Sequence, residues 1–378
     1  MGLAGLDPDP QPRPPAKAEG DSSGAGGSPA RRASGRSLRR VALGAATAVV
    51  IAGLFYYVVP RIVGLGPTLQ RLREGNVWWL GLGVLVEAAS IGGEVVLLRG
   101  VFAAPGTRIG WRASYEITMA GDIATKLVAA AGAGGIALTA WALRASGLGA
   151  DDVASGMVCY EVITYGVYAA ALAFVGFGLV FGLLDGPAPI GVTLVPAVGG
   201  ACLIAATLST RFVAASGQRF MSARAQRATG DHRRWWRRAT QALSALRSGL
   251  TSALAMLRRR DPSLLGVLTA WGFDITSLWA SFHAFGHSPP GGVLIMGYYV
   301  GTLANALPLP GGVGGVEGGM IGAFLAFGVN GSLTVLAVLA YRTISYWLPT
   351  IPGVIAYVQL RHTVGRWRSQ PAGAEPRP

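Results

Sequence analysis

Charged residues are scarce in this 378-residue sequence, and the two signs are unequally represented. Asp, Glu, Lys and Arg together make up 13% of the chain, against roughly a quarter in an ordinary soluble domain. Apolar runs recur throughout the chain after position 40. This pattern excludes a soluble enzyme with a single anchor and predicts one all-α, polytopic membrane domain built as a helical bundle.

Cysteine and histidine are also nearly absent. Cys159 and Cys202 both fall in apolar segments, which excludes a disulfide framework or a thiolate metal site. The histidines are scattered without ligand spacing, at His232, His283, His287 and His362. The sequence has no phosphate-binding loop and no nucleophile elbow. We therefore expect no catalytic residues, no metal, no cofactor and no enzymatic activity.

Lysine is rarer still, because only Lys17 and Lys126 accompany a large set of arginines. The arginines lie between apolar runs, most densely in the basic segment 210–262, and the positive-inside rule places them in the cytoplasm. That segment is either a cytoplasmic loop enriched by topology or a helix on anionic lipid headgroups. No recognition motif accompanies the charge, so a nucleic-acid partner is not expected.

The same distribution divides the chain. Residues 1–40 are rich in Pro, Gly and Ser and are expected to be a disordered tail. Residues 41–362 form the membrane domain, and 363–378 a second tail. With both tails cytoplasmic, the protein is expected to be a multi-pass protein of a bacterial inner membrane. The expected membrane-associated helices are 41–59, 78–98, 113–130, 136–146, 153–183, 190–208, 264–285, 293–307 and 333–360.

Several of these helices carry charge. Glu87 and Glu94 are seven residues apart and share one helix face. Asp122 and Lys126 are four apart and can pair. A structural role and a proton relay both remain open for the acidic residues Glu94, Asp122, Glu161 and Asp274.

The most unusual stretch runs from residue 304 to 348. Pro308 and Pro310 end any helix that arrives there, and six glycines follow around Glu317. Arg342 lies one helix later. Ionisable groups at membrane depth indicate a functional site. The candidate partners of the Arg342 guanidinium are Glu317, Glu161, Glu87, Glu94 and Asp274.

The glycines of this stretch allow two interpretations. Small residues four apart permit close approach of a ligand or simply of another helix. The helix that begins after Pro310 offers free N–H groups to a lipid phosphate. Glu317, near that start, can instead accept those hydrogen bonds itself.

Two parts of the chain look alike. The segment from Gly132 resembles the segment from Gly312, so that Gly147 pairs with Gly328 and Glu161 falls opposite Arg342. Further pairs are Gly134 and Gly135 with Gly314 and Gly315, Tyr160 with Tyr341, and Tyr165 with Tyr346. Chance similarity between Gly/Ala-rich helices is the alternative. If every run crosses, the halves are inverted repeats. The short glycine-rich helices can instead be broken or re-entrant, because a full span takes about 20 residues.

Over residues 40–362, and most specifically in its last third, the chain resembles the lysylphosphatidylglycerol synthase transmembrane-region family of flippase-like membrane proteins. The matching positions are Pro308, Pro310, Gly311, Gly312, Gly314, Gly315, Glu317, Tyr341, Arg342, Tyr346 and Gly353. The resemblance implies movement of aminoacylated phosphatidylglycerol, or of a polyprenyl-linked lipid or glycolipid, across the bilayer. The chain ends soon after its last span, so no aminoacyltransferase domain is expected.

The expected function is therefore a lipid translocase whose substrate is an anionic or aminoacylated phospholipid, or a polyprenyl-linked lipid or glycolipid. The expected substrate-binding residues are Glu317, Arg342, Tyr341, Tyr346, Gly311, Gly312, Gly314, Gly315, Glu161 and Asn305. The alternative is a non-transporting scaffold or accessory subunit for an enzyme of envelope lipid or glycan synthesis. Possible partners are such an enzyme, a second copy of the chain, and anionic headgroups at the basic segment.

Overall fold

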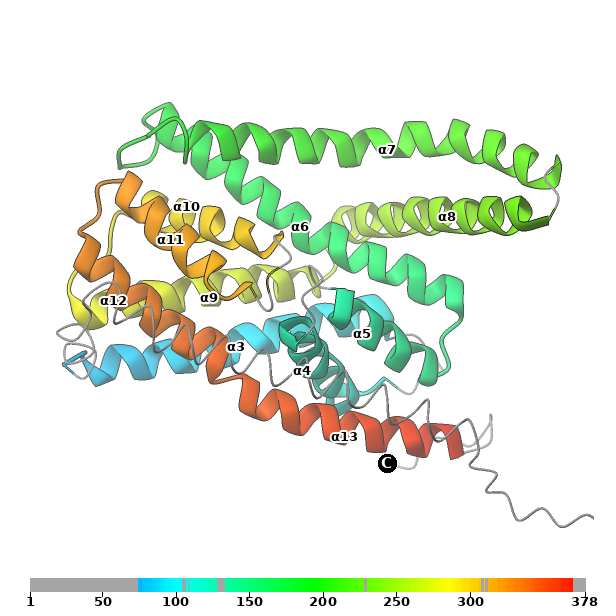
Figure 1. Cartoon of the computed structure of the whole chain (residues 1–378), viewed down its shortest axis with the longest axis horizontal. Helices are drawn as coiled ribbons and strands as arrows, with labels where there is room; N and C mark the ends of the chain where they lie inside the picture. The colour runs from blue at the N-terminus through cyan, green and yellow to red at the C-terminus, as the bar shows by residue number, and fades with distance from the viewer. Residues whose placement is uncertain are drawn as a thin grey trace, which may run out of the picture. The chain divides into compact units, whose positions relative to one another are not determined.

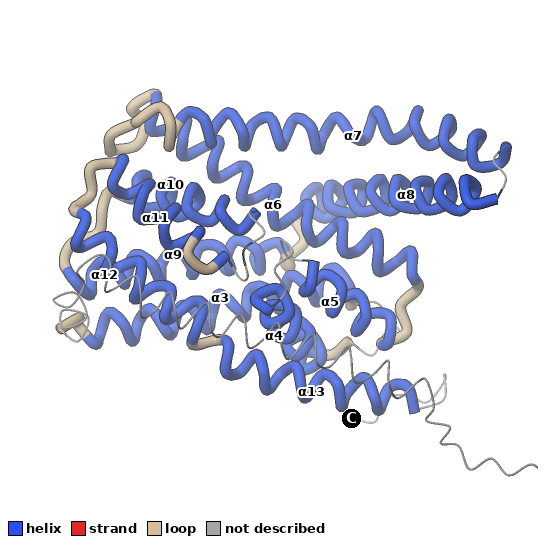
Figure 2. Tube along the Cα trace, in the orientation of Figure 1, coloured by secondary structure: helices blue, strands red, loops and turns tan. Residues whose placement is uncertain are grey.

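The computed structural model describes residues 74–103, 107, 109–127, 133–227, 230–306, 309 and 312–369, although not the side chains of 211–235. These residues belong to one compact unit, Ala45–Pro378. The expected tail 1–40 and first span 41–59 lie outside them, as do Pro308, Pro310 and Gly311. The described part of the chain is helical and has no strand, which confirms the all-α prediction (Figure 2).

The helices follow one another with short connections. The first four described are α3 (Val77–Phe102), α4 (Trp111–Leu127), α5 (Ala133–Ala145) and α6 (Ala150–Val180). Next come α7 (Leu194–Arg227), α8 (Gly230–Arg259), α9 (Leu264–Phe285), α10 (Gly291–Thr302) and the 3₁₀ turn η1 (Leu303–Ala306). The chain continues with α11 (Gly315–Ala326), α12 (Gly331–Arg342), the π-helical turn η3 (Thr343–Trp347) and α13 (Thr350–Ser369).

Helices α3 and α9 form an antiparallel pair. The backbone N–H of Asn76, which caps the start of α3, donates to the carbonyl oxygen of Ala284 near the end of α9 (2.9 Å). In the second half of α3 and close to the start of α9, the backbones meet at Gly93 and Gly266, where an added Cβ on either residue would clash with the other helix. Glycine allows this close approach, which places the polar groups of both helices in one layer.

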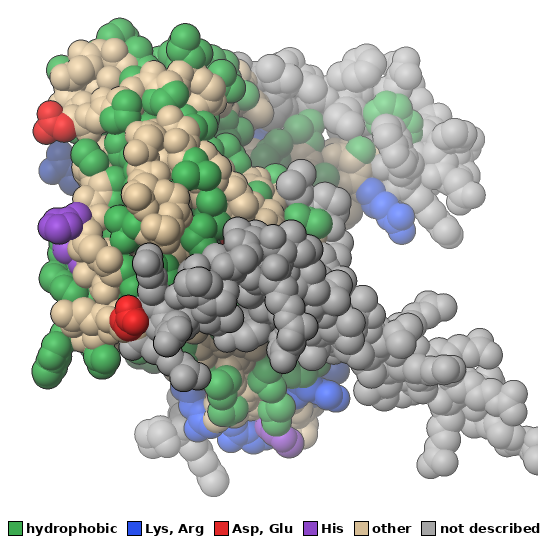
Figure 3. All heavy atoms as spheres, turned by 60° about the vertical axis from the view of Figure 1, so that its left-hand side comes forward, with side chains coloured by type: hydrophobic (Ala, Val, Ile, Leu, Met, Phe, Trp, Pro, Cys, Tyr) green, Lys and Arg blue, Asp and Glu red, His purple; other side chains and the backbone are tan. Residues whose placement is uncertain are grey.

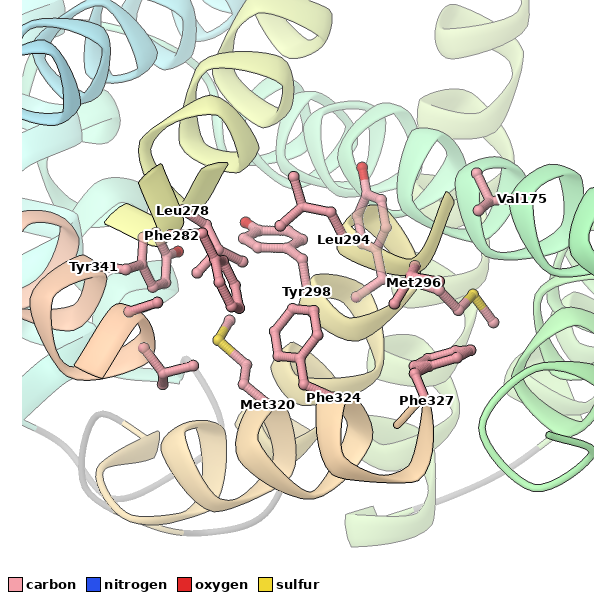
Figure 4. Close-up of a cluster of buried hydrophobic side chains, with 14 of the residues drawn as sticks. Val175, Leu278, Phe282, Leu294, Met296, Tyr298, Met320, Phe324, Phe327 and Tyr341 are labelled. Atoms are coloured by element: carbon pink, nitrogen blue, oxygen red, sulfur yellow. The ribbon is translucent and has the colours of Figure 1, made fainter. Parts of the chain in front are cut away.

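Helix α11 is short but firmly anchored. Phe324 and Met320 of α11 point toward side chains of α9 and α10 (Figure 4). The Phe324 ring meets Phe282 of α9 edge to face, with the ring centroids 5.0 Å apart. Gly301 of α10 lies so close to the Met320 backbone that a Cβ would clash with it. The glycine-rich helix is therefore a packed part of the core.

The basic segment 210–262 is helical over nearly its whole length. Residues 210–227 continue α7, residues 230–259 form α8, and the two helices lie side by side (Figure 1). Its predicted cytoplasmic position stays a prediction. The predicted boundary at residue 362, in contrast, is wrong. Helix α13 continues to Ser369, because Thr363 and Val364 are buried and the Thr363 hydroxyl donates to Glu116 Oε2 in α4 (2.8 Å).

Two of the described helices, α3 and α6, are long and apolar enough to cross a membrane by length and composition. Residues 194–210 of α7 and helix α11 are apolar but shorter. Large hydrophobic side chains are exposed along several helices, for example Leu85, Phe174, Leu265 and Ile355. The face in Figure 3 shows mainly hydrophobic and uncharged side chains outside its grey parts, with few charged ones. This surface suits contact with lipid.

Candidate functional site

The candidate site begins at the N-terminus of α11. The chain reaches it through Gly312 (φ 66°) and Gly314 (φ 84°), in the left-handed region that favours glycine. A Cβ at position 312 would also clash with the Asn305 side chain in η1. Glu317, in the first turn, folds back and accepts a hydrogen bond from the Gly314 N–H (2.7 Å). Its carboxylate therefore occupies part of the anion site that the helix start would otherwise offer.

The other oxygen of Glu317 meets Arg342. Arg342 Nε donates to Glu317 Oε1 at 2.7 Å, and the two residues are only 9% and 5% exposed. Of the candidate partners of Arg342, Glu317 is thus the one that forms an ion pair with it in the structure. The guanidinium does not use all of its hydrogen-bond donors, because its buried Nη2 has no hydrogen-bond partner in the described part of the chain. One buried donor therefore remains available beside the ion pair.

Tyr346 links this pair to a second one. The Arg342 guanidinium lies over the Tyr346 ring, 4.5 Å from its centroid. Lys126 of α4 lies over the same ring at 4.7 Å and donates to the Tyr346 carbonyl oxygen (3.1 Å). Lys126 also pairs with Asp122, as its spacing predicted (2.7 Å). The π-helical turn η3 therefore places one tyrosine ring in contact with two cations from different helices.

The side chain of Asp274, on α9, lies at the centre of a cluster of buried polar groups. Tyr341 donates to Asp274 Oδ1 (2.7 Å) and Tyr298 donates to Oδ2. Glu87 of α3 is 7% exposed and lies opposite Asp274, because Gly83 and Ser90 on either side of it lie against Ser277 and Ala270 of α9. Asp274 also interacts electrostatically with Arg342. The carboxylates of α3 and α9 therefore belong to the same polar layer as the glycine-rich element.

A cavity of about 70 Å³ lies next to Asp274, between α3, α6 and α9. Polar side chains make up much of its wall, among them Glu94 and Ser90 of α3 and Tyr160 and Thr164 of α6. Thr164 Oγ1 is buried and has no hydrogen-bond partner in the described residues. A cavity of this size and polarity has room for a few water molecules.

A much larger groove of about 510 Å³ lies between α6, α7, α8 and α9. Its lining is almost entirely aliphatic, with Glu161 as a charged exception at α6. Glu161 therefore does not join Arg342, although the sequence alignment set the two opposite each other. The reason is geometric: successive helical residues point about 100° apart, so Tyr160 faces the polar cavity while Glu161 faces the groove.

The remaining predicted site residues that the structure describes lie either at the entry of α11 or next to Asp274. Asn305, Gly312, Gly314 and Gly315 lie at the entry of α11, with Asn305 against Gly312 and with Gly315 close to Leu309. Gly311 lies outside the described residues. Tyr341 is turned inward to Asp274, away from the ion pair. Tyr298 and Lys126 were not predicted as site residues, and Asp274 was predicted only as a candidate partner of Arg342 or as part of a proton relay. Charge within an apolar helix is a signal for Lys126 and Asp274.

Glycine contacts recur at matching places in the two similar segments. Gly147 and Gly328, which the alignment pairs, both have positive φ (107° and 80°) and precede α6 and α12. Gly121 of α4 contacts Thr139 of α5, and Gly301 of α10 contacts Gly319 of α11. When Gly135 is aligned with Gly315, Gly121 aligns with Gly301 and Thr139 with Gly319, so the two contacts occupy equivalent positions.

Exposed apolar side chains on several helices and a layer of buried charged groups between them are features of a helical membrane protein. Residues 41–353 match the family described as the lysylphosphatidylglycerol synthase TM region. The chain therefore belongs to that family, which confirms the resemblance seen in the glycine-rich stretch.

Curated relatives carry a less specific name. Three similar proteins of Methanothermobacter thermautotrophicus (strain Delta H) are each called UPF0104 membrane protein. The first is 39% identical over 24% of this chain and 26% of its own length. Another is 31% identical over 33% of this chain and 38% of its own length. The matched regions thus cover well under half of these relatives, and their name specifies membrane location without an activity.

Proposed function

We propose that this protein is a multi-pass translocase of a bacterial inner membrane, with both termini in the cytoplasm. Its substrate is an anionic or aminoacylated phospholipid, or a polyprenyl-linked lipid or glycolipid. Membership of the lysylphosphatidylglycerol synthase TM family supports a role at the membrane. The lipid's headgroup would enter the polar layer while its acyl chains stay in the bilayer.

The buried Glu317–Arg342 pair is the observation that carries this proposal. A purely structural pair would be expected to use its hydrogen bonds internally, because an unpaired buried donor is unfavourable. Here Nη2 of Arg342 keeps an unused donor beside a helix N-terminus that the chain enters through two glycines with positive φ. A phosphate or phosphodiester oxygen is the acceptor that guanidinium and helix N–H groups both favour.

Inverted repeats form part of the proposal. The paired glycines, the matching contacts of α4 with α5 and of α10 with α11, and the antiparallel α3–α9 pair all support two related halves. In transporters built this way, substrate sites lie where the broken helices of the two halves meet. The polar layer lies beside α3 and α9, which pack together and which the proposal assigns to different halves.

Lipid exchange between leaflets tests the proposal. Purified protein would be reconstituted into vesicles that carry trace fluorescent phosphatidylglycerol, lysylphosphatidylglycerol, phosphatidylcholine or a polyprenyl phosphate, and a membrane-impermeant quencher would report the inner-leaflet fraction. We expect faster exchange than in protein-free vesicles for at least one anionic or aminoacylated lipid. If no headgroup is exchanged, the scaffold alternative is favoured instead.

A further inference from the structure

We propose that Glu87 and Asp274 form a proton-binding site and that proton release from this site through the polar cavity drives lipid translocation. This inference rests on the proposed translocase function for its coupling step. The proton site itself has an independent test, given below.

Glu87 faces Asp274, because Gly83 and Ser90, one turn to either side of Glu87 on α3, lie against Ser277 and Ala270 of α9. Two facing buried carboxyl groups can share a hydrogen bond only with a proton between them. Both Asp274 oxygens already accept hydrogen bonds from tyrosines, Tyr341 and Tyr298. Asp274 is therefore the acceptor, and Glu87 carries the proton. If the proton left, two buried negative charges would lie in contact, which is strongly unfavourable.

Glu87 also has unused hydrogen-bonding capacity. The residue is 7% exposed, and its Oε2 atom has no partner in the described residues. A buried acid that served only to join α3 to α9 would be expected to have both oxygens satisfied. Instead, one oxygen is left in the layer that contains Asp274 and the polar cavity.

A path leads outward from this pair. Asp274 lines the cavity together with Glu94, and the cavity has room for water to connect them. Glu94 in turn interacts electrostatically with Asp122, whose side chain is 38% exposed. The proton would leave the Glu87 hydroxyl, pass through cavity water to the Glu94 carboxylate, and continue toward Asp122. Only O–H bonds break and form, so no other reactant is needed.

The groups that face this path come from every neighbouring helix. They are Glu87 and Glu94 of α3, Asp122 and Lys126 of α4, Tyr160 of α6, Asp274 of α9, Tyr298 and Tyr299 of α10, and Tyr341 and Arg342 of α12. The two cations, Lys126 and Arg342, favour a negative charge on the carboxylates. They therefore assist proton release and oppose rebinding.

Arg342 connects the proton site to the headgroup site. It interacts with Asp274 and also pairs with Glu317. A new negative charge on Glu87 would attract the guanidinium and weaken its hold on Glu317 and on any bound phosphate. Proton release would thus favour release of an anionic headgroup.

Glu87→Gln tests this mechanism, since glutamine can still donate to Asp274 but cannot release a proton. Exchange of fluorescent phosphatidylglycerol would be measured in vesicles with and without an imposed pH gradient. In the wild type, the gradient should change the exchange rate severalfold. Glu87→Gln should exchange at one rate in both conditions, and Asp185→Asn, an exposed loop acid, should respond like the wild type. A Glu87→Gln variant that keeps the full response would overturn the proposal.

Infrared spectroscopy of the reconstituted protein separates the proton site from lipid transport. The carbonyl band of a protonated carboxylic acid should be present in the wild type at neutral pH, retained in Asp185→Asn, and diminished in Glu87→Gln. A band that is unchanged in Glu87→Gln would refute the proton site even if lipids are exchanged. If the band behaves as expected but no lipid is exchanged, the proton site stands and the translocase function fails.

Discussion

The Glu317 carboxylate accepts hydrogen bonds from two donors at once. One oxygen accepts from the Gly314 backbone N–H and the other from Arg342 Nε, both at 2.7 Å. The start of α11 and the end of α12 are therefore joined through one buried side chain. This arrangement explains how a glycine-rich segment, with little side chain of its own to pack, keeps a fixed position.

Removal of the Glu317 carboxylate should destabilise the fold. Glu317→Ala leaves the Arg342 guanidinium buried without a counter-charge, which costs about 3–5 kcal/mol in comparable buried pairs. Denaturant unfolding of the purified protein in micelles would measure the loss. Glu317→Ala combined with Arg342→Met should recover part of it, because no unpaired charge then remains. A single variant as stable as the wild type would show that the pair is solvated or broken.

Close packing of α10 on α11 predicts a position-dependent effect of alanine. At Gly301 a Cβ would clash with the Met320 backbone, so Gly301→Ala should destabilise by about 1–3 kcal/mol. At Gly318, also helical, nothing lies within 4 Å of an added Cβ. There alanine should be neutral or stabilising by up to about 1 kcal/mol. Equal effects at the two positions in thermal unfolding would argue against the α10–α11 contact.

The length of α13 can be tested by truncation. A chain that ends after His362 loses buried Thr363 and Val364, and with them the hydrogen bond to Glu116. Its unfolding free energy should fall by at least about 2 kcal/mol. A chain that ends after Ser369 keeps these contacts and should match the full chain. The account of α13 would be contradicted if both truncated chains were equally stable.

Acid should weaken the start of α9. The Ser263 side chain and backbone N–H donate to Asp261 Oδ1, and these hydrogen bonds, the side-chain one first, lower the pKa of Asp261. Because the pKa of Asp261 is lower in the folded state, its ionised form stabilises the fold at pH values above the usual Asp pKa of about 4. This stabilisation is lost as the pH falls through the lower pKa of the folded state. The stability difference between the wild type and Asp261→Asn should therefore shrink in acid. Ser263→Ala should reduce this pH dependence, and an unchanged profile would count against the hydrogen bonds.

Much of the helical framework could be predicted from apolar periodicity and breakers. The expected helix 264–285 coincides with α9, and the expected helix 136–146 ends one residue after α5 ends at Ala145. Residues 363–369 were missed because their polar composition resembles a tail. Tertiary contacts, among them the hydrogen bond of Thr363 to Glu116 and the burial of Val364, explain their helical structure.

The candidate site was only partly predictable. Charge within an apolar stretch identified Glu317 and Arg342 and gave a set of possible partners. Choosing among them required knowing which faces of α11 and α12 meet, and one sequence does not contain that information. The position of Glu161 shows the limit: alignment set it opposite Arg342, but its helix face points into the aliphatic groove.

The most direct test of the lipid-translocase proposal is leaflet exchange of fluorescent phosphatidylglycerol and lysylphosphatidylglycerol by Arg342→Lys. Lysine keeps the charge opposite Glu317 but loses the planar guanidinium whose Nη2 donor is unused in the structure. We predict that the variant inserts and unfolds within about 1 kcal/mol of the wild type and yet loses exchange. Wild-type exchange by a stably folded Arg342→Lys protein would contradict a guanidinium–phosphate contact.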